Sequence, residues 1–246
     1  EGHIEIINSA KQRRDVVVAS IFVNPMQFGV NENLDAYPRT LEADLVKLEA
    51  ARAAAVFTPM TADISPDGIS QHTVVDVPGL TDVLCGASRP GHFRGVTTVV
   101  SKLLGIVRPH IAAFGAKDLQ QVLVIRKMVH DLSINTEIDV VPTVRDSDGL
   151  AMSSRNCFLS HDERALAPLF SRMLEKTAKQ VAVSGSSIET VIAEAKATLT
   201  DAGFDIDYLE ARHTHDLSKA SSINQETAIF GAAFLGTTRL IDNRIV

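Results

Sequence analysis

The chain has 246 residues, of which 45% are hydrophobic and 22% charged, so it can bury a sizeable core in one or two domains and disorder is not expected. A net charge of −6 argues against a broad nucleic-acid-binding surface, and no apolar run reaches the roughly eighteen residues of a membrane span. Cys85 and Cys157 lack metal or disulfide spacing, so we expect ordinary thiols. The composition predicts a soluble, cytoplasmic protein without nucleic-acid or membrane partners.

The first part of the chain alternates strand and helix patterns. The run VVVASIFV at residues 16–23 is continuous and rich in β-branched residues, which is typical of a parallel strand buried on both faces. Thr40 then caps a helical pattern that continues to Leu48. The pattern predicts further helices at 96–107 and 119–132, and further strands at 55–58, 111–114 and 138–144.

This alternation predicts an α/β fold with a doubly wound, Rossmann-like parallel sheet in residues 1–143. Ligands of such sheets lie beyond the carboxyl ends of the strands. Residues 144–246 differ and predict a smaller α+β domain, with helices at 161–183 and 187–202 and strands at 206–211 and 227–235. Because the chain opens inside a helical pattern, we expect a strand to precede Glu1.

Two segments near the start of the chain have residues suited to ligand binding. Gly2 and His3 begin a helical pattern, where glycine allows close approach and a helix N-terminus attracts phosphate, although the pair alone fits a surface histidine better. Gln27 follows the first predicted strand. Its neutral amide could orient a nucleophilic carboxylate at less cost than an arginine, and the alternative is a glutamine that caps a turn.

The segment Gly115–Gln121 ends a predicted strand and begins a helix. Lys117 offers a positive charge for phosphate, and Asp118 could accept hydrogen bonds from ribose hydroxyls. Gln121 lies one helical turn beyond Lys117, on the same face. The alternative for this segment is an ion pair between Lys117 and Asp118 at the entry of the helix.

The segment GLAMSSRN, residues 149–156, combines a glycine, two serines and an arginine near the predicted domain junction. Its donors could surround a triphosphate, with Arg155 stabilising charge at the reacting phosphate. The basic segment Arg89–Arg94 is equally consistent with a phosphate contact and a solvated loop. His213 and His215 have no convincing metal-ligand spacing, so we expect structural or surface roles.

In their joint order, these motifs resemble the pantothenate synthetase family of the nucleotidyltransferase superfamily, which shares its fold with class I aminoacyl-tRNA synthetases. The resemblance runs nearly end to end. Ala116 and Leu119 depart from residues that are more often acidic and aromatic in the family. The motifs are Glu1–His3, Ser20–Gly29, Asp35–Thr40, Arg89–Gly95, Gly115–Gln121 and Gly149–Asn156.

The resemblance implies specific roles. Gly2 and His3 would end the His-x-Gly-His nucleotide motif, whose first histidine would precede Glu1, and His3 would assist transfer at the α-phosphate. Gln27 and Gln121 would bind pantoate, with Gln27 also near β-alanine. Further ATP contacts would be Gly115, Ala116, Lys117, Asp118 and Val144, together with the phosphate-binding loop residues Met152, Ser153, Ser154 and Arg155.

The implied reaction is an ATP-dependent condensation of pantoate with β-alanine. The pantoate carboxylate attacks ATP to give pantoyl-adenylate and pyrophosphate, and the β-alanine amine then releases AMP. Mg²⁺ would arrive with ATP without a dedicated protein ligand, and the family implies a homodimer. Two alternatives are an adenylyltransferase acting on a phosphorylated cofactor precursor and a nucleotide-binding relative without turnover.

Overall fold

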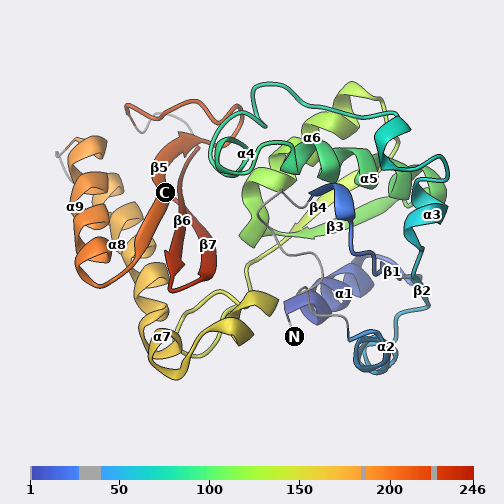
Figure 1. The fold of residues 1–246 in the computed structure, drawn as a ribbon, viewed down its shortest axis with the longest axis horizontal. Helices are drawn as coiled ribbons and strands as arrows, with labels where there is room; N and C mark the ends of the chain where they lie inside the picture. The colour runs from blue at the N-terminus through green and yellow to red at the C-terminus, as the bar shows by residue number, and fades with distance from the viewer. Residues whose placement is uncertain (1, 28–39, 184–186, 223–225) are drawn as a thin grey trace. The chain divides into compact units, whose positions relative to one another are not determined.

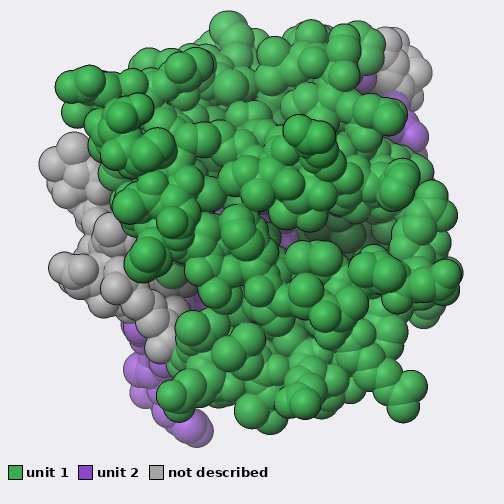
Figure 2. Space-filling model, turned by 90° about the vertical axis from the view of Figure 1, so that its right-hand side faces the viewer, with its two compact units in different colours: residues 1–116, 120–142 green, residues 117–119, 143–246 purple. Residues whose placement is uncertain are grey.

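The structure is a computed structural model that describes residues 2–27, 40–183, 187–222 and 226–246. It divides into two compact units, coloured green and purple in Figure 2. The first unit contains residues 1–116 and 120–142, and the second contains residues 117–119 and 143–246. Three parts of the predicted motifs, namely Glu1, residues 28–29 and residues 35–39, lie outside the described residues.

The first unit alternates helices with short parallel strands (Figure 1). Its strands are β1 (Val18–Ser20), β2 (Ala55–Phe57), β3 (Ile111–Gly115) and β4 (Glu137–Val141). Its α-helices are α1 (Gly2–Arg13), α2 (Leu41–Ala50), α3 (Thr61–Ile64), α4 (Cys85–Ser88), α5 (His92–Val107) and α6 (Leu119–Asp131). Its 3-10 turns are η1 (Pro25–Gln27), η2 (Ile69–Gln71) and η3 (Ala116–Asp118). Some residues of α6 and η3 belong to the second unit.

The strands of the first unit confirm the predicted parallel α/β class. β1 pairs with β2, Val18 opposite Ala55, and β3 pairs with β4, Ile111 opposite Glu137. In the described residues these are two separate pairs. Helix α1 packs against β3 and β4. The apolar cluster around Ile7 joins α1, β1 and α2.

Burial of residues 16–23 on both faces was a wrong prediction. Val17 and Ala19 are buried, whereas Val16 is 71% exposed and Val18 is 42% exposed. The side chains therefore alternate between a packed face and an open face, as the pleat of a strand requires. The β-branched composition favours a strand but does not determine whether both faces are covered.

The second unit is an antiparallel sheet covered by helices. Its strands β5 (Asp205–His213), β6 (Thr227–Leu235) and β7 (Thr238–Ile245) lie in that order, and Leu235 pairs with Thr238 across the turn. Helices α8 (Pro168–Val183) and α9 (Ile188–Asp201) pack against each other and against this sheet (Figure 1). Their shared core includes Phe170, Leu174 and Ile229.

The helix predicted over 161–183 is two helices, α7 (His161–Leu166) and α8, which begins at Pro168. Proline has no N–H to donate to the preceding turn, so it begins a helix more readily than it continues one. Strand β7 was not predicted, because its polar residues Asp242, Asn243 and Arg244 obscure the alternating pattern.

Among the described residues, no helix combines the length and the apolar character that a membrane span requires.

Candidate functional site

Gly2 and His3 form the first turn of α1, and His3 is exposed there. Helix α1 packs on the carboxyl end of β3, where a Cβ placed on Gly115 would meet the Ile6 side chain at 3.6 Å. This end of a parallel strand is where ligands of doubly wound sheets bind. Gly115 thus packs against Ile6 of α1, about one helical turn beyond Gly2 and His3.

Gln27 ends the short turn η1, which is held against α5 by hydrogen bonds that involve Asn24 and His92. Buried Asn24 donates from Nδ2 to the Gln27 side-chain oxygen at 3.3 Å and to the Gly95 carbonyl at 3.0 Å. The Nδ1 atom of His92 is 2.8 Å from the Gln27 carbonyl. A Cβ on Gly95 would lie 2.2 Å from the Met26 carbonyl oxygen, so only glycine allows this approach. Gln27 is therefore rigidly framed.

Gln120 and Gln121 differ in their surroundings although they are neighbours on α6. Gln120 is buried, and its amide donates to the carbonyls of Leu80 and Val83 while its oxygen accepts from the Cys85 N–H. These three hydrogen bonds hold the segment of residues 80–85 against α6. Gln121 is only partly buried, which leaves the second predicted substrate glutamine with the exposure that ligand contact requires.

Lys117 and Asp118 lie in the turn η3, and these two residues belong to the second unit. No ion pair joins Lys117 to Asp118 among the described residues, which removes the support for a helix-entry ion pair. The Asn243 side chain on β7 donates to the Lys117 carbonyl at 3.0 Å. Lys117 also lines a small hollow together with Ser153, Asn156 and Asp242.

The segment that begins at Gly149 is the second arm of a tight hairpin. The Met152 N–H donates to the Val144 carbonyl at 3.0 Å, which joins two of the predicted ATP-binding residues. Gly149 has a φ of +91°, a conformation that favours glycine in the turn. Arg164 on α7 donates to Asp148 at 2.6 Å, and this hydrogen bond lowers the pKa of the Asp148 carboxyl below its usual range. The turn is thus held by charge as well as by backbone.

Ser153, Ser154 and Arg155 lie where the hairpin enters a 3-10 turn, η4 (Ser154–Phe158). The Ser153 hydroxyl accepts from the Arg155 N–H at 3.2 Å and so caps this turn. Asn156 donates back to the Ala151 carbonyl at 3.1 Å. The loop is therefore a built structure, in which the Arg155 backbone is fixed by its neighbours.

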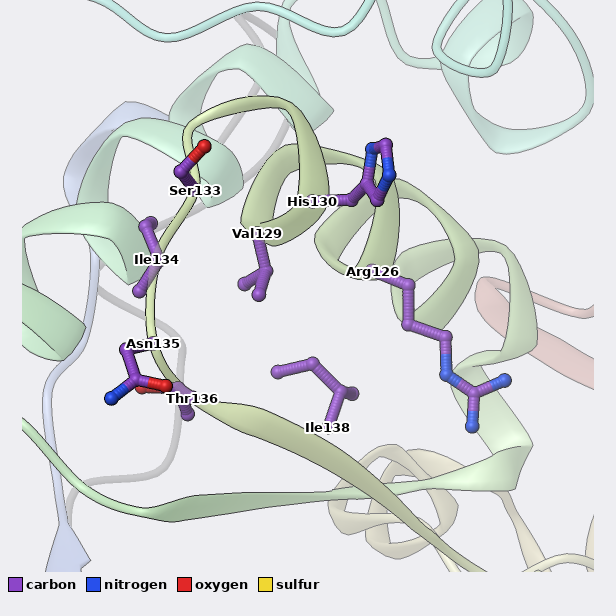
Figure 3. A pocket seen from close by; sticks show the side chains of 8 residues that line it. All are labelled: Arg126, Val129, His130, Ser133, Ile134, Asn135, Thr136 and Ile138. Carbon is purple, nitrogen blue, oxygen red and sulfur yellow. The ribbon is translucent and has the colours of Figure 1, made fainter.

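A separate hollow of about 450 Å³ lies in the first unit, between the end of α6 and the segment that leads into β4 (Figure 3). Val129 and Ile138 point toward one another there, and none of the predicted site residues lines it. Within the described residues, no group of three or more His, Cys, Asp or Glu could hold a metal ion. His213 and His215 are therefore not part of such a group.

Three residues that hold the predicted site were not identified from the sequence. His92 lies in the basic segment Arg89–Arg94, yet it contacts the Gln27 backbone and begins α5. Asn24 and Asn243 fix Gln27 and Lys117 through their amides. Asn24 directly follows a predicted strand, which was a usable signal; Asn243 had none, because its strand was not predicted.

Known proteins resemble the chain along almost its whole length. The family model of pantoate-beta-alanine ligase matches residues 1–245. The pantothenate synthetase of Shewanella oneidensis is 57% identical over 243 residues, covering 99% of this chain and 86% of that protein, and the one from Shewanella amazonensis is 54% identical over 244 residues, with the same shares covered.

Solved structures agree. Pantothenate synthetase from Thermus thermophilus has a TM-score of 0.93 at 41% identity, covering 99% of this chain and 88% of that one. Pantoate-beta-alanine ligase from Francisella tularensis, crystallised with beta-gamma ATP and beta-alanine, has a TM-score of 0.81 at 35% identity, covering 100% of this chain and 85% of that one. This chain belongs to the pantoate-beta-alanine ligase family.

Proposed function

We propose that the protein joins pantoate to β-alanine in an ATP-dependent reaction that passes through pantoyl-adenylate and releases pyrophosphate and AMP. The match to the ligase family over residues 1–245 carries this proposal. The built loop at 149–156 and the adjoining Lys117 supply phosphate-binding groups of the kind the reaction needs.

In the second unit, two of the proposed ATP contacts, Lys117 and Ser153, line the same small hollow. Ser153 lines this hollow, and Ser154 and Arg155 follow it in η4. Hydroxyl, backbone N–H and guanidinium donors suit phosphate oxygens, and Arg155 would stabilise the charge that develops as pyrophosphate leaves. Asp118, Val144 and Met152 complete the contacts proposed in this unit.

In the first unit, we assign nucleotide binding to Gly2, His3, Gly115 and Ala116, with His3 assisting transfer at the α-phosphate. Exposure of His3 in the first turn of α1 supports this assignment, because the N–H groups of a helix start attract phosphate.

Gln27 and Gln121 would bind pantoate, and Gln27 would also contact β-alanine. The framing of Gln27 by Asn24 and His92 supports a positioning role.

The chemistry needs no covalent enzyme intermediate. The pantoate carboxylate oxygen attacks the α-phosphorus and the bond to pyrophosphate breaks; the β-alanine nitrogen then attacks the acyl carbon and the bond to AMP breaks. Amide hydrogen bonds from the glutamines orient the carboxylate without neutralising it. Positioning of this kind is worth effective molarities of about 10⁵ to 10⁸ M in well-oriented systems.

We also propose that Mg²⁺ enters with ATP and is held mainly by phosphate oxygens, as is usual for this ion. A cytoplasmic homodimer completes the proposal. Removing Mg²⁺ with a chelator should abolish turnover, and light scattering should give twice the chain mass.

Purified protein incubated with ATP, pantoate and β-alanine should release equal amounts of AMP and pyrophosphate. Production of ADP alone would contradict the proposal. A stable dinucleotide product would favour an adenylyltransferase, and ATP binding without pyrophosphate release would favour a relative without turnover. The Arg155→Met variant should bind pantoate normally and turn over at least about 100-fold more slowly. This is the scale of the rate loss when an enzyme loses one donor that stabilises transition-state charge.

A further inference from the structure

Two adjacent polar residues on β7, Asp242 and Asn243, are buried although neither was predicted to have a role. Asp242 is 4% exposed and Asn243 is 8% exposed. Neighbouring residues of a strand point to opposite faces of the sheet. This dipeptide therefore contacts two different segments of the second unit.

On one face, Asp242 holds a network that reaches Gly149. Arg145 donates to the two carboxylate oxygens of Asp242 at 2.8 and 2.9 Å, and Arg244 adds a contact at 3.2 Å. Both arginines also donate to the Ser171 hydroxyl, at 2.9 and 2.8 Å. That hydroxyl donates to the Gly149 carbonyl at 2.9 Å, so the first residue of the phosphate-binding loop is attached to the buried carboxylate.

On the other face, Asn243 donates to the Lys117 carbonyl at 3.0 Å. Lys117 and Ser153 line the same hollow, and Asp242 lines it as well. Asp242 and Asn243 thus hold the backbone at Gly149 and at Lys117, which are the two segments assigned to phosphate binding in this unit.

Stability alone does not require this arrangement. A buried carboxylate with arginine partners loses hydration that the pairing only partly restores, and apolar side chains of the same volume are often as stable or more so. Bidentate arginine contacts instead impose a fixed geometry on both partners. The network is therefore better suited to positioning than to stabilisation.

We propose that Asp242 and Asn243 are positioning residues, which hold the loop 149–156 and Lys117 in register for the phosphates of ATP. This inference rests on the proposed function for its ligand. It assigns Asp242 to the loop, through Arg145 and Ser171, and Asn243 to Lys117. Neither residue is proposed to touch the reacting atoms.

The test compares Asp242→Asn, Ser171→Ala and Asn243→Ala with wild type and with Glu210→Gln. Glu210 is the matched control, because it forms an ion pair with Arg212 at 2.6 Å in the same sheet and does not line the hollow. Ser171→Ala removes one hydroxyl and keeps the charge pair, so it tests the network even if Asp242→Asn fails to fold. Three measurements are made: steady-state kinetics, ATP binding by calorimetry, and amide hydrogen exchange at Met152, whose N–H bonds to Val144.

Asp242→Asn should lower kcat/KM for ATP by about 10- to 100-fold, the scale of a small misplacement, while KM for β-alanine stays unchanged. Exchange at Met152 should accelerate in Asp242→Asn and Ser171→Ala and not in Asn243→Ala, which should weaken ATP binding alone. Glu210→Gln should match wild type throughout. Equal loss of affinity for all substrates would indicate general destabilisation and overturn the proposal.

Failure of the proposed function is distinguishable from failure of this inference. Wild-type protein that makes no AMP would contradict the ligase proposal, yet exchange at Met152 and ATP affinity would still decide the positioning role. Folded Asp242→Asn or Ser171→Ala with wild-type exchange and wild-type ATP affinity would overturn the inference, even in an active ligase.

Discussion

Replacing Gly95 with alanine should disable the proposed pantoate-binding side of the first unit while leaving the protein folded. The added Cβ would lie 2.2 Å from the Met26 carbonyl oxygen and 2.7 Å from the Gln27 nitrogen. Both neighbours are backbone atoms of η1, so no flexible side chain can move aside. The strain must displace η1, and Gln27 with it.

The size of the effect follows from these distances. Ordinary contact begins near 3.4 Å, so η1 must retreat by roughly 1 Å, a misplacement that costs on the order of 100-fold in rate. Overpacking should cost about 1–3 kcal/mol, and alanine should recover up to about 1 kcal/mol inside helix α5. The net loss of stability should therefore be at most about 3 kcal/mol, whereas activity should fall by about two orders of magnitude.

Gly105→Ala is the control, because it adds the same methyl group to the same helix with no neighbour within 4 Å. Initial rates of AMP formation at varied pantoate, with thermal melts followed by circular dichroism, separate the two effects. We expect Gly105→Ala to keep wild-type kinetics and a slightly higher Tm. Gly95→Ala with wild-type kcat/KM for pantoate would refute the reasoning that Gln27 is positioned by this close approach.

Three other changes test separate contacts. His92→Phe removes the contact with the Gln27 carbonyl and should raise KM for pantoate about tenfold, consistent with a lost hydrogen bond; unchanged initial rates would contradict it. Gly231→Ala would place its Cβ 2.9 Å from an α8 ring and should destabilise the second unit by about 1–3 kcal/mol in urea unfolding. Arg164→Gln removes the partner that lowers the Asp148 pKa, so wild type should have the higher Tm above pH 3.8. The difference in Tm should disappear as the pH falls below the folded-state pKa of Asp148. A difference that persists in acid would show that the Asp148 carboxylate is not its cause.

Several elements could be predicted because their signals are local. Amphipathic spacing predicts a helix at 187–202, and the structure confirms it as α9, with Ser187 as its N-terminal cap. The run at residues 111–114 predicts β3, and the pairing of Ile111 with Glu137 confirms a parallel partner. Pro168 was a sequence signal for the break between α7 and α8. The apolar pattern continues through it, however, and therefore predicted a single long helix.

The sequence by itself determined the parallel α/β class, the change to an α+β pattern after residue 143, the motif at 149–156 and the family. These depend on short-range periodicity and on residue order, which the chain states directly. Only the tertiary structure decided what holds the site: Asn24 meets Gly95 across 71 positions, and Asn243 meets Lys117 across 126. Periodicity within an element contains no information about such partners, because packing between elements selects them. The same packing leaves Val16 and Val18 exposed in a run whose composition predicted burial.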